Sequence, residues 1–329
     1  PLIIMSKLPL PLFVAVAMLS LSAFSLQAQT NFRGWNGNTS TDWNDSTNWD
    51  GGVVPAGPDD VAAVRQSTNN PTVIGSGSNI SLQKMFIGEN DTGSVTVDSG
   101  ATVDASGGLS VITKQGSLTV NGSWTGAVIV SHDATLSIGA SGSHFGNITA
   151  NNSSSIAING SVSGNIQNNS DATQTIGSAG SLVGDFELNG SDIAIISGSI
   201  LGRFSLNQGA SVTINPTADI RSTSGNSWFY NNAAITWNVA ADGSVATLRT
   251  SRNESSSGAF DGEWRGPDAG VSMTVNLDDF DGGALSLTLF TDVQNDTNVE
   301  NNVVFTLGGN DVSEEFSYSN GTFTGTVVG

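Results

Sequence analysis

Short runs of alternating apolar and polar residues fill the middle of the chain, and glycines recur between the runs. The glycines at positions 107, 126, 146, 164, 184 and 202 follow one another at intervals of about 18 to 20 residues. A period of this length corresponds to one coil of a solenoid and is too short for a repeated domain. We therefore predict an all-β chain in which each coil stacks on the one before it.

Three sets of positions in each coil are predicted to point inward. The first set lies two and four residues after each glycine: Leu109 and Val111, Val128 and Val130, Ile148 and Ala150, Ile166 and Asn168, Phe186 and Leu188, Phe204 and Leu206. The second is Leu118 and Val120, Leu136 and Ile138, Ile156 and Ile158, Ile176 alone, Ile193 and Ile195, Val212 and Ile214. The third is Trp124, His144, Val162, Leu182 and Ile200. Three strands per coil predict a three-faced β-solenoid of about eight coils between Thr72 and Asn226.

The third set indicates whether two residues with possible functional roles belong to the core. Trp124 lies among apolar positions, so we expect a buried ring and not a platform for a sugar. His144 occupies the same position in the next coil, and we expect a core residue whose ring nitrogens are satisfied, not a metal ligand. His132 has no partner in register.

The predicted organisation has four parts. Residues 1–28 are a signal peptide, 29–70 a tryptophan-rich N-terminal cap, 71–225 the solenoid, and 226–329 a C-terminal β cap or small sandwich. The aromatic density rises and the period breaks after Asn226, although continuation of the solenoid is the alternative for this last part. Coils of this length are similar to those of filamentous bacterial adhesins, which implies a right-handed β-helix.

The N-terminal cap is predicted from Trp35, Trp43 and Trp49, which are spaced by Gly, Asn and Asp. An open solenoid end exposes apolar interior and unpaired backbone, and large rings can cover it. Binding of carbohydrate by these rings is the alternative.

The motif that begins at Trp35 and ends at Asp59-Asp60-Val61 is W-x-G-x5-W-x4-N-W-x-G-G-x2-P-x3-D-D-V. It resembles the N-terminal signature of secreted Verrucomicrobia- and Planctomycetes-type proteins with autotransporter/PEP-CTERM-associated β-strand repeats. The stretch from Phe86 to Val103 resembles one such repeat. The resemblance covers about residues 35–125 and implies a β-helical protein that is released or exposed on the cell surface, with no catalytic residue attached to it.

Export is also expected from the start of the sequence. Lys7 precedes an apolar run over residues 8–21, and Ala28 supplies a small residue for cleavage. A membrane anchor or a buried helix is the alternative, which Pro9 and Pro11 disfavour. The expected location is the medium or the cell surface, without membrane insertion after cleavage. No apolar tail with basic residues closes the printed sequence, so we expect a released protein or a fragment of a longer one.

Composition excludes several classes of function. The formal net charge is −19 with 10 Lys and Arg, which argues against nucleic acid and anionic membranes. The chain has no cysteine and only 2 histidines, so neither a disulfide scaffold nor a Ser/His/Asp set is expected. We expect no cofactor and no metal.

Among the outward positions, three charged residues are predicted to lie close together. The register predicts that Asp185, Glu187 and Arg203 lie on one face of adjacent coils. Acids beside an arginine are what a polysaccharide lyase would use, whereas a surface salt bridge is the plainer interpretation. The turn from Asp278 to Gly283 contains three aspartates, but Phe280 occupies the place of a calcium ligand, so a solvated turn is expected.

These observations favour a non-catalytic, structural or adhesin-like extracellular protein whose partner is an extracellular polysaccharide or another surface or matrix protein. The first alternative is a carbohydrate-binding module that uses C-terminal aromatics, with Trp228, Tyr230 and Trp264 as candidate ligand-binding residues. The second alternative is a β-helical polysaccharide lyase.

Overall fold

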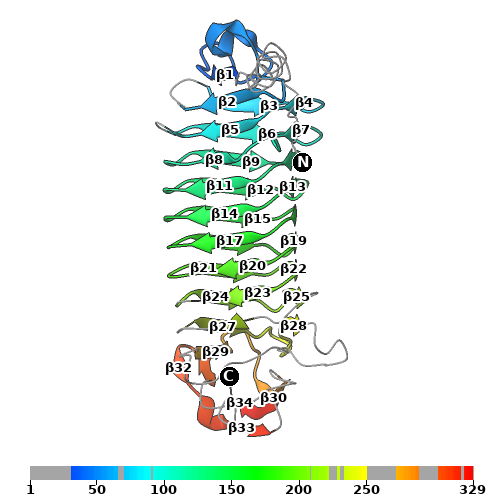
Figure 1. Cartoon of the computed structure of the whole chain (residues 1–329). Coiled ribbons are helices and arrows are strands. Elements are labelled where there is room, and N and C mark those ends of the chain that lie inside the picture. The colour runs from blue at the N-terminus through cyan, green and yellow to red at the C-terminus, as the bar shows by residue number, and fades with distance from the viewer. Residues whose placement is uncertain are drawn as a thin grey trace, which may run out of the picture.

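Stacked parallel strands form an elongated rod in the computed structural model of the chain (Figure 1). The structure describes residues 31–65, 70–89, 92–207, 209–221, 228–229, 233–249, 272–288, 303–319 and 322–328. Within these ranges the regular elements are strands and short 3-10 turns, with no α-helix. The predicted all-β solenoid is therefore confirmed.

One face of the rod is a ten-stranded parallel sheet. Its strands, in spatial order, are β1 (Asn31–Gly34), β2 (Asp60–Val64), β5 (Lys84–Ile87), β8 (Ser110–Ile112), β11 (Val128–Ser131), β14 (Ile148–Asn151), β17 (Ile166–Asn169), β20 (Phe186–Leu188), β23 (Phe204–Leu206) and β26 (Trp228–Phe229). At about 4.8 Å per strand, the sheet is roughly 43 Å long.

The second face is a nine-stranded sheet, also parallel. It contains β4 (Asn79–Ser81), β7 (Thr102–Asp104), β10 (Ser123–Thr125), β13 (Ser143–Phe145), β16 (Ser161–Ser163), β19 (Ser181–Val183), β22 (Ser199–Leu201), β25 (Asp219–Arg221) and β28 (Thr247–Arg249).

A twelve-stranded sheet forms the third face. It contains β3 (Thr72–Ile74), β6 (Ser94–Val97), β9 (Ser117–Val120), β12 (Thr135–Ile138), β15 (Ser155–Ile158), β18 (Thr173–Ile176), β21 (Ile193–Ile196), β24 (Ser211–Ile214), β27 (Ala234–Asn238), β29 (Ser272–Asn276), β31 (Val303–Leu307) and β32 (Asn310–Asp311). All pairs in it are parallel except β31 with β32. From β2 to β28, successive strands fall on the three faces in turn, as the three inward sets predicted.

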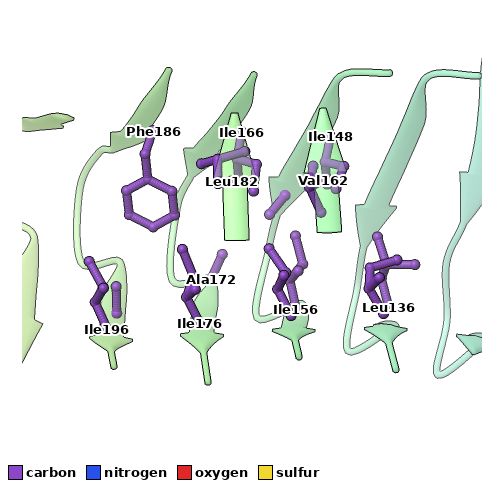
Figure 2. Packing of buried hydrophobic residues seen from close by; sticks show 14 of the residues in the cluster. Leu136, Ile148, Ile156, Val162, Ile166, Ala172, Ile176, Leu182, Phe186 and Ile196 are labelled. Atoms are coloured by element: carbon purple, nitrogen blue, oxygen red, sulfur yellow. The ribbon is translucent and has the colours of Figure 1, made fainter. Parts of the chain in front are cut away.

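The interior consists of columns of like side chains, because each strand pairs in register with the same strand of the next coil. Leu136, Ile156, Ile176 and Ile196 lie along one wall, and Ile148, Ile166 and Phe186 along the opposite wall (Figure 2). Val162 and Leu182 come from the nine-stranded sheet. Most of the predicted inward residues are buried, including Trp124, which has no exposed surface.

Two parts of the predicted register were wrong. Leu109 is 45% exposed and Val111 lies on the outer side, whereas Ser110 and Ile112 take their places inside, opposite Val128 and Val130. Five residues lie between Asp104 and Ser110, but only two lie between their partners Thr125 and Val128, so this corner is longer and the strand begins later.

The second error lies in β21. Ile193 and Ile195 are 49% and 40% exposed, whereas Ala194 and Ile196 are buried. Ala194 pairs with Gln174, which is itself buried, and Ile196 pairs with Ile176. A one-residue shift moves every side chain of a strand to the opposite face. The run Ile193–Ile196 is apolar at every position, so its alternation did not fix which residues face inward.

The N-terminal tryptophans are buried at one end of the rod. Trp49 lies edge-on to Trp35 and Trp43, with ring centroids 5.0 and 4.6 Å apart. Trp49 Nε1 donates to the Trp43 carbonyl at 2.8 Å, and Trp35 Nε1 donates to the Asn70 carbonyl at 3.0 Å. The 3-10 turn Ser46–Asn48 carries the chain from Trp43 to Trp49, and a second 3-10 turn, Asp50–Gly52, follows Trp49. All three rings belong to the core, as expected for a cap, and they offer no exposed face to a sugar.

The other end combines continued stacking with a small antiparallel sheet. β27, β29 and β31 pair in parallel beyond β24, so coil-like pairing extends past residue 226. The antiparallel sheet contains β30 (Gly283–Thr288), β34 (Thr322–Val327) and β33 (Phe316–Ser319), preceded by the 3-10 turn Ser313–Glu315. Phe316 stacks on the core residue Phe305 with ring centroids 3.9 Å apart, which joins this sheet to the stack.

Candidate functional site

The charged group predicted on the ten-stranded face is present. An Arg203 guanidinium nitrogen lies 3.4 Å from Asp185 Oδ2, and Glu187 Oε1 lies 3.3 Å from Asn189 Nδ2 and 3.5 Å from Asn207 Nδ2. The Arg203 and Asp185 side chains are 41% and 34% exposed, so solvent screens their attraction. The register thus brings Asp185 and Arg203 together on an open strand face, as predicted, whereas the contacts of Glu187 are with Asn189 and Asn207.

Asp185 also has a structural role that the sequence did not indicate. Asn147 Oδ1 accepts the main-chain N–H of Asn165 at 3.0 Å, and Asn165 Oδ1 accepts that of Asp185 at 2.9 Å. Asp185 Oδ1 then accepts the N–H of Arg203 at 2.9 Å. The residue that precedes each strand therefore ties its coil to the next, and Asp185 is one member of this ladder. A second ladder joins Asn215, Asn238 and Asn276 through their side-chain amides.

The aromatic candidates fall largely outside the described part of the chain. Tyr230 and Trp264 lie outside the described residues. Trp228 begins β26, at the end of the ten-stranded sheet, where its backbone pairs with Ser205. A ligand-binding role for these three residues stays a prediction.

The two histidines differ in environment. His144 is 1% exposed between Trp124 and Val162 in the nine-stranded sheet, so the predicted core position is confirmed. Its ring nitrogens form no well-oriented hydrogen bond within the described residues, contrary to expectation. Burial lowers the pKa of His144 to about 4, and the Gly146 backbone opposes this shift only in part. His132 is exposed on a turn, 3.5 Å from Thr113 Oγ1.

Coils near that of His144 also contain buried polar side chains. Gln174 Nε2 donates to Asn168 Oδ1 inside the core. Asp192 is fully buried, and its carboxylate accepts the N–H groups of Ala172 and Asn189, both at 2.8 Å. Burial raises the pKa of Asp192. These groups are enclosed by the coils, so they serve packing and register and do not line a surface site.

The aspartate-rich turn is tied to the turn that follows β31. Asp278 Oδ1 accepts the Gly308 N–H at 2.6 Å, and Phe280 packs against the core. Within the described ranges, no three His, Asp or Glu side chains are grouped closely enough to hold a metal ion. Asp278, Asp279 and Asp281 are exposed, as expected for a solvated turn.

The most regular surface of the rod was not singled out from the sequence. On the twelve-stranded sheet, from β6 to β24, the outward residues form two columns, which we call the hydroxyl face. One column contains Ser94, Ser117, Thr135, Ser155, Thr173, Ile193 and Ser211. The other contains Thr96, Thr119, Ser137, Ala157, Thr175, Ile195 and Thr213. The recurring motif of two hydroxyl residues around one apolar residue, as in Ser117–Thr119, was the available signal.

Comparison with protein-family models, curated proteins and solved structures gave no match. Among the residues that the structure describes, no helix is both long and apolar enough to span a membrane.

Proposed function

We propose that this chain is a non-catalytic extracellular protein of the structural or adhesin type, in which the rod presents a repeating polar surface to a polysaccharide or to another matrix protein. The observation that carries the proposal is the in-register parallel stacking from β2 to β26, which repeats each outward position once per coil. A contact made by one coil is thus available again about 4.8 Å further along.

Repetition favours binding to extended partners. A single exposed hydroxyl or amide contributes little to affinity, because water competes for it. Many identical contacts on one rigid body act together, since the first contact raises the effective concentration of the others. The rod is rigid because its coils share one continuous core. A polymer or a surface with its own repeat is the kind of partner that gains most from this arrangement.

Export supports the extracellular part of the proposal. The apolar run over residues 8–21 and the resemblance of the Trp35–Val61 motif to secreted repeat proteins both favour it. The absence of cysteine is compatible with an oxidising environment, because strand pairing and the shared core stabilise the rod without disulfides.

The lyase alternative has weaker support than the structural one. Asp185 and Arg203 form a partly exposed pair, and Asp185 is committed to the ladder through the Arg203 N–H. General acid–base catalysis needs groups held near the reacting atoms, and electrostatic stabilisation is weak where water screens it. Both features favour a structural role for this pair.

The test combines binding and turnover in one sample. The purified full chain is mixed with alginate, pectate, cellulose or chitin, with and without calcium, and cosedimentation is measured together with the ultraviolet absorbance of unsaturated sugar products. We expect retention on at least one polymer or on extracellular matrix from a bacterial biofilm, without product. Sustained product formation that disappears in Arg203→Ala would overturn the proposal in favour of a lyase, and lack of retention on every surface would contradict the adhesive function.

A further inference from the structure

The hydroxyl face is a two-dimensional grid. Of its fourteen positions, eleven are Ser or Thr, and the exceptions are Ala157, Ile193 and Ile195. Neighbouring strands place these side chains about 4.8 Å apart along the rod, and residues i and i+2 lie roughly 6.6 Å apart across it. Seven successive strands keep this register, so both repeats persist over the whole face.

Most hydroxyls of the grid remain available to an external partner. Within the described residues, the single hydrogen bond between members of the two columns joins Ser117 Oγ to Ser94 Oγ at 2.9 Å. Thr135, Ser155 and Thr173 are exposed, and the other hydroxyl residues of the face are half-buried between their neighbours. Side chains held on a rigid sheet lose little conformational entropy on binding, which favours a partner that is itself ordered.

The chemistry of the face selects the kind of partner. None of the fourteen residues is charged, although the chain has a formal net charge of −19. A charged polymer would be matched by charged side chains, which are absent from these columns. None of the fourteen is aromatic either, so the face lacks the flat rings that provide large apolar contact areas for sugars. What remains is a neutral grid of hydrogen-bonding groups and methyls.

We propose that the hydroxyl face binds the surface of ice. The two repeats of the grid are of the same order as the spacings between oxygen atoms in the surface planes of ice. Threonine and serine hydroxyls would hydrogen-bond to water molecules in the lattice, while threonine methyls would occupy the gaps between them. This inference goes beyond the proposed function, because ice is neither a polysaccharide nor a matrix protein, although both proposals use the repeating surface of the rod.

Ice-affinity partitioning of the fluorescently labelled full chain tests the proposal. A growing ice surface should incorporate the wild-type chain, and the same sample should show freezing-point hysteresis. Thr175→Tyr places a bulky ring in the middle of the grid and should reduce incorporation roughly tenfold, as expected for a central contact of an interface. Ser163→Tyr is the matched control, because Ser163 is exposed on the nine-stranded sheet and should leave incorporation unchanged.

A gain-of-function variant distinguishes recognition of ice by the hydroxyl grid from nonspecific adsorption. Ile193→Thr with Ile195→Thr completes the two columns across β21, and both positions are exposed, so folding should be preserved. We expect increased incorporation into ice, with an unchanged melting profile by circular dichroism. Exclusion of the wild-type chain from ice, or equal incorporation of the Thr175 and Ser163 variants, would overturn the proposal. Exclusion from ice with retention on crystalline cellulose would overturn the ice proposal and leave the proposed function standing.

Discussion

Asp185 connects two successive coils through both oxygens of its carboxylate: Oδ1 accepts the main-chain N–H of Arg203 at 2.9 Å, and Oδ2 lies 3.4 Å from the Arg203 guanidinium. The first contact repeats what Asn147 and Asn165 do in the two coils before it. The second is an ion pair on a partly exposed face, where such pairs contribute less than about 1 kcal/mol. The ladder contact, and not the charge, is therefore the main contribution of Asp185 to stability.

Substitution of Asp185 distinguishes these two roles. Asp185→Asn keeps an acceptor in the ladder, so we expect a loss of less than about 1 kcal/mol in the free energy of unfolding. Asp185→Ala leaves the Arg203 N–H without its partner and should cost about 1 kcal/mol more than the asparagine variant. Urea denaturation followed by circular dichroism measures both. Equal losses for the two variants would show that the charge, and not the ladder, stabilises this site.

The inward and outward positions of β15 predict opposite effects for neighbouring substitutions. Ile158 has no exposed surface, whereas Ala157 lies on the outer side of the same strand. Ile158→Asp buries an unpaired charge and should cost more than about 4 kcal/mol, so that the rod does not fold cooperatively. Ala157→Asp should change stability by about 0.5 kcal/mol or less. Thermal melts of the two variants provide the measurement, and similar melting temperatures would contradict the register.

The fold could be predicted from the sequence because each coil of a solenoid repeats the same short pattern of residues. Strand alternation and the glycine interval were sufficient to identify three strands per coil and to place Trp124 and His144 inside. They did not predict which residues face inward in strands whose register depends on the neighbouring coils. Leu109 was misplaced because corner length cannot be seen in an alternation, and β21 was misplaced because four consecutive apolar residues fit either phase.

The candidate site could be predicted less completely. Stacking of Asp185 against Arg203 followed from the period, but the ladder through Asp185 Oδ1 depends on side-chain rotamers and on the backbone at the corner. The hydroxyl face is visible in the sequence as pairs such as Ser117 and Thr119. These pairs form a continuous face only because seven strands keep one register. A pair of hydroxyls is common in any strand, and only the stack converts pairs into a grid.

Burial of His144 predicts a pH dependence of stability. Its pKa falls from 6.5 in the unfolded chain to about 4 in the folded chain, so the unfolded chain binds the additional proton between these values. Stability is then complete above pH 6.5 and decreases as the pH falls toward 4, by roughly 3 kcal/mol. Urea denaturation at several pH values should show this slope in the wild type.

His144→Val is the matched variant for that slope, since Val162 occupies the same column in the next coil. We expect stability in this variant to depend much less on pH between 6.5 and 4. The buried carboxyl of Asp192 acts in the opposite direction, because its raised pKa makes the folded state more favourable as the pH falls. Parallel pH profiles for wild type and His144→Val would show that His144 is not the group responsible.

The polar pair in the core predicts a stabilising double substitution. Gln174 Nε2 donates to Asn168 Oδ1, but Asn168 Nδ2 and Gln174 Oε1 are buried without a hydrogen-bond partner among the described residues. Gln174 pairs with Ile156 and Ala194 in the adjacent coils, and Asn168 pairs with Ala150, so apolar side chains fit both columns. Replacing both residues, as Asn168→Leu with Gln174→Ile, removes two unsatisfied groups and should raise the free energy of unfolding by about 1–3 kcal/mol. Gln174→Ile alone leaves Asn168 without its side-chain partner and should gain less. Chemical denaturation of the two variants and the wild type measures the difference, and a double variant less stable than the wild type would show that the pair is needed to hold the register of β17 and β18.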